Sequence, residues 1–128
     1  GGPGGWWILA EPEVHFVIDQ EVTVPDIAGW KKTRMAEVPV EHKFTVVPDW
    51  VCEILSASTE STDRDIKKPL YARYSVNWLW LLHPVRQELE TYELDKGQWV
   101  LTGEYDADDE ICAQPFKELK LRLQELLD

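Results

Sequence analysis

The sequence lacks any long hydrophobic run and contains very little cysteine. Its longest continuous apolar runs, such as "WLWLL" at 78–82, are five residues long, whereas a membrane span needs about 18. Its two cysteines, Cys52 and Cys112, have no regular spacing, and no secretion signal precedes them. The chain is therefore predicted to be a soluble cytoplasmic protein with reduced thiols and no contact with membranes.

Basic residues are also scarce, with 13 Lys and Arg against 24 Asp and Glu, which gives a formal net charge of −11 and a pI near 4.6. An acidic surface repels phosphate unless basic side chains gather on one face, so non-specific binding to nucleic acid is disfavoured. The three histidines lack zinc-ligand spacing, and no phosphate-cradling loop, nucleophile elbow or dinucleotide fingerprint is present.

What the chain does have is enough apolar material for a core. It contains 128 residues, of which 44% are hydrophobic, and seven are Trp. These values predict one folded domain over residues 1–128. The first residues, "GGPGGWW", include no initiating Met and lead directly into a strand pattern, so we expect a domain trimmed at its N-terminus.

Most of the chain reads as strands. Residues 6–18 and 22–30 are β-branched and aromatic runs that predict a hairpin or a closely spaced strand pair. Residues 31–45 are polar and predict a loop. Residues 50–56 predict a third strand, and the almost wholly apolar 76–84 predicts a central strand buried on both faces.

A helix is predicted between the last two of these strands, over about residues 63–74. Thr62 is the expected N-cap, and Asp65 is expected to complete a capping box. Pro69 lies inside this segment and should kink or shorten the helix, because it removes one backbone hydrogen bond.

The C-terminal third begins with an alternating pattern. Residues 88–111 alternate around an Asp-Lys-Gly turn and predict an antiparallel hairpin. Residues 115–128 have apolar side chains at helical spacing, but their "LKLRL" also alternates like a strand, so both assignments stay open.

Two acidic residues, Asp26 and Glu53, lie in strand-like segments whose other residues are mostly apolar. Asp26 follows Pro25 at the end or in the middle of the second strand run, and Glu53 lies inside "VCEIL". Pairing of these strands would bring the two together as an oxygen-rich site for Mg²⁺ or Mn²⁺. Asp26 could equally mark a turn. A charged Glu53 among apolar neighbours costs several kcal/mol unless a cation or hydrogen bonds compensate it.

The predicted helix carries the charged run "DRDIKK", residues 63–68. Such a run is usually a solvated helix face. A lysine that projected from it over the strand end could instead hold an attacking water beside the metal, where carboxylates and phosphate would compensate its charge.

The segments "VPDIAGW", "PDWVCEILSASTESTDRDIKKPLYARYSVNWLWLLHP" and "LETYEL" resemble a large bacterial family of restriction-endonuclease-like proteins in the PD-(D/E)XK nuclease superfamily. The resemblance covers roughly residues 6–127. It implies an α/β (α+β) fold, with a mixed sheet flanked by a helix and an added C-terminal β-hairpin. It also implies that the N-terminal helix and strands of the family fold are missing here.

The resemblance further implies a metal site. Asp26 and Glu53 match the two acidic positions, and the backbone carbonyl of Ile54 is expected as a third ligand. The usual lysine, two residues after the second acid, is replaced by Leu55. The matching position lies instead on the helix, at Lys67, and its neighbour Lys68 stays open as the alternative.

Other positions carry weaker implications. Asp63 matches a commonly acidic position and would orient the lysine or cap the helix. Ala57 replaces a usual Pro, and His83 replaces a frequent Asp, which we interpret as a structural variation. Glu13, on the first strand run, is a further candidate ligand, as is Glu11.

The sequence therefore leads to a Mg²⁺- or Mn²⁺-dependent endonuclease acting on nucleic acid, with DNA as the expected substrate. The alternative is a non-catalytic interaction domain that retains the nuclease fold, as a possible homodimer. The acidic composition and the missing N-terminal part favour that alternative. A third, weaker reading is a degraded remnant that folds but binds nothing.

Overall fold

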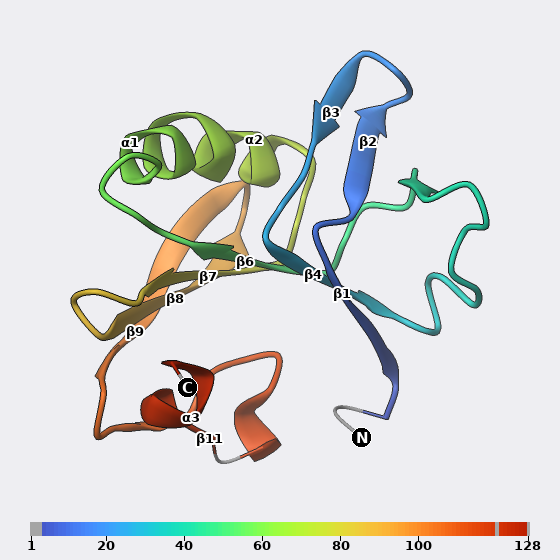
Figure 1. Cartoon of the computed structure of the whole chain (residues 1–128). Helices are drawn as coiled ribbons and strands as arrows, with labels where there is room; N and C mark the ends of the chain where they lie inside the picture. Colours follow the sequence, from blue (N-terminus) through green and yellow to red (C-terminus); the bar gives the residue numbers. More distant parts are fainter. Residues whose placement is uncertain (1–3, 120, 128) are drawn as a thin grey trace.

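The computed structural model describes residues 4–119 and 121–127. Its main sheet has six strands, in the order β1-β4-β6-β7-β8-β9, and a helical segment lies over one face while the C-terminal segment lies over the other (Figure 1). The six strands are β1 (Trp6–Ala10), β4 (Ile27–Lys31), β6 (Trp50–Ile54), β7 (Trp78–His83), β8 (Glu88–Asp95) and β9 (Gln98–Asp106). β6 and β7 are parallel, and all other neighbours are antiparallel. The predicted mixed α+β architecture is therefore confirmed.

The predicted N-terminal strand pair is present, but each of its strands is broken into two. β1 pairs with β4 in the main sheet, while β2 (Glu13–Val17) pairs with β3 (Glu21–Thr23) in a second sheet. The first break falls at Glu11, which has a positive φ of 50°, and the second falls at Pro25, which has no N–H to donate. Asp26 therefore lies immediately before β4 and not within a strand.

The second sheet, in the order β3-β2-β5, projects from the main sheet beside α2 (Figure 1). We call β2, β3 and their connecting turn, residues 13–23, the arm. The predicted loop 31–45 ends in the short strand β5 (Lys43–Phe44), which runs parallel to β2. Phe16 of the arm stacks on Tyr74 with ring centroids 4.6 Å apart, so the arm is held against the end of the helical segment.

Gly29 of β4 permits close packing on the face of the main sheet that the C-terminal segment covers. A Cβ atom there would lie 2.9 Å from Ile8 Cδ1 and 3.1 Å from Trp50 Cε3. Gly29→Ala is expected to destabilise the protein by about 1–3 kcal/mol through overpacking. Chemical denaturation measures the loss. Gly5→Ala is the control, because a Cβ there meets no atom within 4 Å; equal stability of the two variants would contradict the prediction.

The helical segment runs from Glu60 to Arg73, as α1 (Glu60–Thr62), a π-helical turn (Asp63–Lys67) and α2 (Lys68–Arg73). The predicted N-cap at Thr62 is wrong, because Thr62 already has helical dihedral angles and makes no side-chain cap. The chain turns at Ser56 instead. Its carbonyl accepts the N–H of Glu60, and its own N–H donates to Thr59 Oγ1.

Pro69 neither ends nor visibly breaks this segment. It lies inside the continuous segment, as the second residue of α2 directly after the π-helical turn. The turn before it widens, so the Lys68 N–H donates five residues back to the carbonyl of Asp63. The helical segment therefore continues past Pro69 to Arg73, and its irregular part is the π-helical turn at 63–67.

The central position of β7 is confirmed, since it lies fourth of the six strands and is almost entirely buried. The predicted hairpin is present as β8–β9, with Lys96 and Gly97 both at positive φ in its turn, but it ends at Asp106 and not at residue 111. The C-terminal tail contains both of the structures left open, a short strand β11 (Leu121–Arg122) and a helix α3 (Leu123–Leu127). β11 pairs with β10 (Glu110–Ile111).

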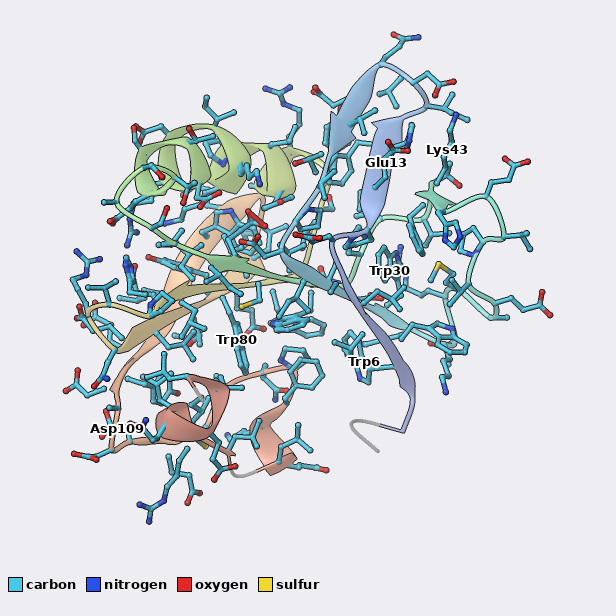
Figure 2. All side chains as sticks on the ribbon, viewed as in Figure 1. Trp6, Glu13, Trp30, Lys43, Trp80 and Asp109 are labelled. Atoms are coloured by element: carbon cyan, nitrogen blue, oxygen red, sulfur yellow. The ribbon has the colours of Figure 1, made fainter. Side chains whose placement is uncertain are left out.

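Two clusters of buried side chains lie on opposite faces of the main sheet. One, under the helical segment, includes Val51, Leu55 and Tyr71. The other holds the C-terminal segment, because Trp50 and Trp80 contact the ring of Phe116, and Trp80 points from the sheet toward that segment (Figure 2). No helix among the described residues is long and apolar enough to cross a membrane.

Candidate active site at the β4–β6 junction

Asp26 and Glu53 meet where β4 begins and β6 ends. Ile27 pairs with Cys52 in antiparallel register, which places Asp26 opposite Glu53. One hydrogen bond joins the two residues, and a second joins Asp26 to the residue after Glu53. The Asp26 N–H donates to Glu53 Oε1 at 3.0 Å, and the Ile54 N–H donates to Asp26 Oδ2 at 2.7 Å. The strand pairing expected from the sequence therefore brings the two carboxylates together.

Glu53 is a charged residue in the apolar core. Its side chain is 1% exposed, on the sheet face that the helical segment covers. Burial raises the pKa of Glu53 to about 7, although a hydrogen bond and the charge of Lys67 act in the opposite direction. A carboxylate in this position requires a cation beside it.

Lys67 supplies that cation in the structure. Its Nζ lies 2.8 Å from Glu53 Oε2, 3.7 Å from Asp63 Oδ1 and 3.4 Å from the carbonyl of Val24. Burial alone would lower the pKa of Lys67, but Glu53, Asp63 and Asp26 raise it above its ordinary value. Lys67 is therefore a charged ammonium held among three carboxylates.

Asp63, expected to orient the lysine or to cap the helix, does not cap it. Asp63 is buried, one helical turn before Lys67, and it raises the pKa of Glu53 through a side-chain hydrogen bond. Its position beside both Glu53 and Lys67 fits the orienting role. The capping alternative arose because acidic residues are common in the first turn of a helix, where they interact favourably with the helix dipole.

Two of the candidate residues lie elsewhere. Lys68 Nζ is 3.8 Å from the ring centre of Tyr92, and burial lowers the pKa of Lys68. Glu13 lies on the arm near Lys43 (Figure 2), where its carboxylate is 2.9 Å from His15 Nε2. Lys68 and Glu13 therefore contact Tyr92 and His15, and not Asp26 or Glu53.

The backbone of Ile54 is directed toward Asp26. Within one strand residue the N–H and C=O point to the same side, and the Ile54 N–H donates to Asp26. The Ile54 carbonyl therefore faces the β4 side of β6, where Asp26 lies. Carboxylate and carbonyl oxygens of this kind are ligands that Mg²⁺ and Mn²⁺ accept.

The donor set is small. Within residues 4–119 and 121–127 no group of three or more His, Cys, Asp or Glu side chains is arranged to hold a metal ion. A cation here would be held by Asp26, Glu53 and a main-chain oxygen, and water would complete its shell. Mg²⁺ commonly binds in this way, through one or two carboxylates and several waters. The residues present fit such an ion.

Tyr71 is a member of the site that sequence reasoning missed. It is fully buried, and its hydroxyl donates to Glu53 Oε1 at 3.3 Å. Its ring lies among core side chains. In the sequence it therefore looks like an ordinary core aromatic residue, and nothing indicates that its hydroxyl contacts an acidic residue. The available signal was its spacing, four residues after Lys67, which puts the two on one helical face.

A second polar cluster lies on the same face of the sheet, over β7 and β8. Arg64 of the helical segment forms an ion pair with Glu90, which also accepts hydrogen bonds from Tyr92 and His83. Arg64 and other donors lower the pKa of Glu90 to about 2 against the effect of burial. His83 is buried among these groups, which agrees with the structural interpretation of that residue.

None of the curated proteins with which the sequence was compared is significantly similar to it. Among solved structures, the fold matches a crystal structure from Anabaena variabilis, of a protein described as "a putative nuclease belonging to DUF820". The match has a TM-score of 0.73 and 22% sequence identity, and it covers 96% of this chain and 68% of that one. At this identity the similarity establishes the fold.

The family comparison covers almost the whole sequence. Residues 2–124 match the model of the Uma2 family, which carries the description "Putative restriction endonuclease". The matched range includes every residue of the β4–β6 junction described above. The chain therefore belongs to the Uma2 family of restriction-endonuclease-like proteins.

Proposed function

We propose that this protein is a divalent-metal-dependent nuclease that hydrolyses phosphodiester bonds in nucleic acid. The observation that carries the proposal is the convergence of Asp26, Glu53 and Lys67, with Glu53 buried and Lys67 Nζ 2.8 Å from its Oε2. Buried carboxylates with a perturbed pKa and a lysine partner are typical of catalytic sites. The family description and the nuclease neighbour support the same class of reaction.

Each residue has a role in this proposal. Asp26, Glu53 and the Ile54 carbonyl hold Mg²⁺ or Mn²⁺. The bound ion supplies Lewis acidity toward the scissile phosphate and lowers the pKa of a coordinated water. Lys67 positions the attacking water or offsets the negative charge that grows on the phosphate.

The substrate we propose is DNA. With a net charge of −11, the protein has no general attraction for a polyanion. The metal and Lys67 therefore provide positive charge at the point where the phosphate must bind. Substrate binding should accordingly depend on the divalent ion more strongly than it does in basic nucleases.

Isothermal titration of Mn²⁺ tests the metal site without requiring a known substrate. Asp26→Asn and Glu53→Gln are expected to weaken binding at least about tenfold, because each loses a charged ligand. Asp65→Asn is the matched control, since Asp65 is exposed on the helical segment and contacts Ser61. Circular dichroism checks that all variants remain folded.

Metal-dependent cleavage of DNA and RNA then tests the reaction. Unchanged Mn²⁺ affinity in both site variants, or cleavage that persists in both, would rule out the proposed site. If the wild-type protein binds no metal and cleaves no nucleic acid, the interaction-domain alternative takes its place. Native mass spectrometry would then test for the homodimer.

A further inference from the structure

The two oxygens of the Glu53 carboxylate have different surroundings. Oε1 accepts the Asp26 N–H at 3.0 Å and the Tyr71 hydroxyl at 3.3 Å. Oε2 accepts Lys67 Nζ at 2.8 Å. A carboxylate oxygen has about two lone-pair directions. The two donors therefore occupy Oε1, whereas Oε2 accepts the side chain of Lys67, whose Nζ also lies 3.7 Å from Asp63 Oδ1.

Tyr71 is well placed to fix the orientation of this carboxylate. It is 0% exposed, and its ring makes an edge contact with Phe16, with centroids 6.2 Å apart. The Tyr71 hydroxyl donates to Glu53 Oε1, and this bond links the helical segment to the end of β6.

We propose that Tyr71 is a positioning residue, which together with the Asp26 N–H holds Glu53 Oε1 and presents Oε2 to the divalent cation. The inference rests on the proposed function, because it assumes that a cation binds Glu53. It adds a member to the site and assigns the oxygen that the cation uses. Lys67, which contacts the same oxygen, has to share it with the cation or move aside.

The alternative is that Tyr71 only satisfies a buried hydroxyl. Buried hydroxyls are nearly always hydrogen-bonded, so the bond to Glu53 alone would be expected in any core. The two roles differ in their effect on metal binding. A hydroxyl that only completes the core affects the free energy of unfolding, whereas a hydroxyl that orients a ligand also affects the affinity for the metal.

Tyr71→Phe separates these roles, because it removes the hydroxyl and keeps the buried ring. We expect the dissociation constant for Mn²⁺, measured by isothermal titration, to rise about tenfold, which is the lower end for loss of a group that orients a metal ligand. Tyr92→Phe is the matched control, since Tyr92 is also buried and donates to a carboxylate, Glu90, outside the site.

A spectroscopic reading accompanies the titration. Coordination of Glu53 should change the environment of the Tyr71 hydroxyl bonded to it, so Mn²⁺ should produce a tyrosine difference absorption in the wild type and in Tyr92→Phe. The signal should be absent in Tyr71→Phe.

The outcomes are distinguishable. Wild-type Mn²⁺ affinity in folded Tyr71→Phe, or an equal loss in Tyr92→Phe, overturns the role of Tyr71. If Asp26→Asn and Glu53→Gln still weaken binding in that case, the proposed function stands without Tyr71. If neither of those variants changes binding, or if the wild type binds no Mn²⁺, both the proposed site and this inference fail.

Discussion

Replacing Lys67 with Met is expected to lower metal-dependent cleavage by about 10²- to 10⁴-fold, which is the usual contribution of a positioned proton-transfer or charge-stabilising group. Met keeps the length and the apolar stem of the side chain. The affinity for Mn²⁺ should stay the same or increase, because an ammonium 2.8 Å from Glu53 Oε2 opposes a second cation on that oxygen. A general loss of structure would lower the Mn²⁺ affinity together with the rate, so a rate loss without an affinity loss distinguishes the two explanations.

Single-turnover cleavage at saturating Mn²⁺ measures the rate, and titration measures the affinity. Lys68→Met is the natural control, because Lys68 is adjacent in sequence but packs on Tyr92. We expect near wild-type cleavage for this variant. A rate loss in Lys68→Met as large as that in Lys67→Met, or no loss in the latter, would contradict the assignment of the lysine.

The second large effect is expected on acid stability. The pKa of Glu90 is about 2 in the folded protein, against an ordinary value of 4.5, because hydrogen bonds from Arg64, Tyr92 and His83 outweigh the effect of burial. A lowered pKa stabilises the fold at pH values above 4.5. That contribution, up to about 3 kcal/mol, is lost as the pH falls through 4.5 toward 2.

Urea unfolding of the metal-free protein at pH 7, 4 and 3 measures this loss. Glu90→Gln should show a smaller fall in the free energy of unfolding than the wild type does, since it has no carboxylate to protonate. Glu93→Gln, at an exposed position on the same strand, should follow the wild type. Parallel pH profiles for wild type and Glu90→Gln would refute the prediction.

Glu53 acts in the opposite direction over a different pH range. Its folded pKa of about 7 lies above its ordinary value of 4.5. The corresponding stabilisation is complete below 4.5 and disappears as the pH rises through 7. Because Glu53 is present in the wild type and in the variants, its contribution cancels when their free energies of unfolding are compared at the same pH. The remaining difference comes from Glu90.

The juxtaposition of Asp26 and Glu53 could be predicted because strand pairing has only a few registers and the apolar pattern fixes which residues share a face. The choice between Lys67 and Lys68 could not. Consecutive helical residues point about 100° apart, so the answer depends on the rotation of the helix about its own axis. In the structure Lys67 faces Glu53 and Lys68 faces Tyr92, and the segment contains a π-helical turn at 63–67 that the sequence pattern did not predict.

The failed predictions have a common physical origin. Thr62 looks like a cap in a window of a few residues, yet the turn at Ser56 captures the first free N–H groups earlier in the chain. The run 6–18 looks like one strand, yet Glu11 turns it into a second sheet. In each case residues outside the window that carried the local pattern determined the structure.

Polar groups that face the core were the least predictable part of the site. Neither the apolar sequence neighbours of Tyr71 nor the "LETYEL" segment around Glu90 indicates which residue its polar group contacts. Their partners are distant in the chain, since Tyr71 bonds to a residue 18 positions away and Arg64 reaches Glu90 across 26. Such pairs are visible only when the sheet and the helical segment are both in place.

Because the N-terminal hairpin is divided between two sheets, the main chain connects the arm directly to the β4–β6 junction. The chain crosses between sheets at two points, and these are tied together because the Glu11 N–H donates to the Asp26 carbonyl at 2.9 Å. Asp26 thus joins the two crossings through its main chain, while its side chain accepts the Ile54 N–H at the end of β6. A substitution that displaces either crossing is therefore expected to shift the Asp26 carboxylate relative to Glu53.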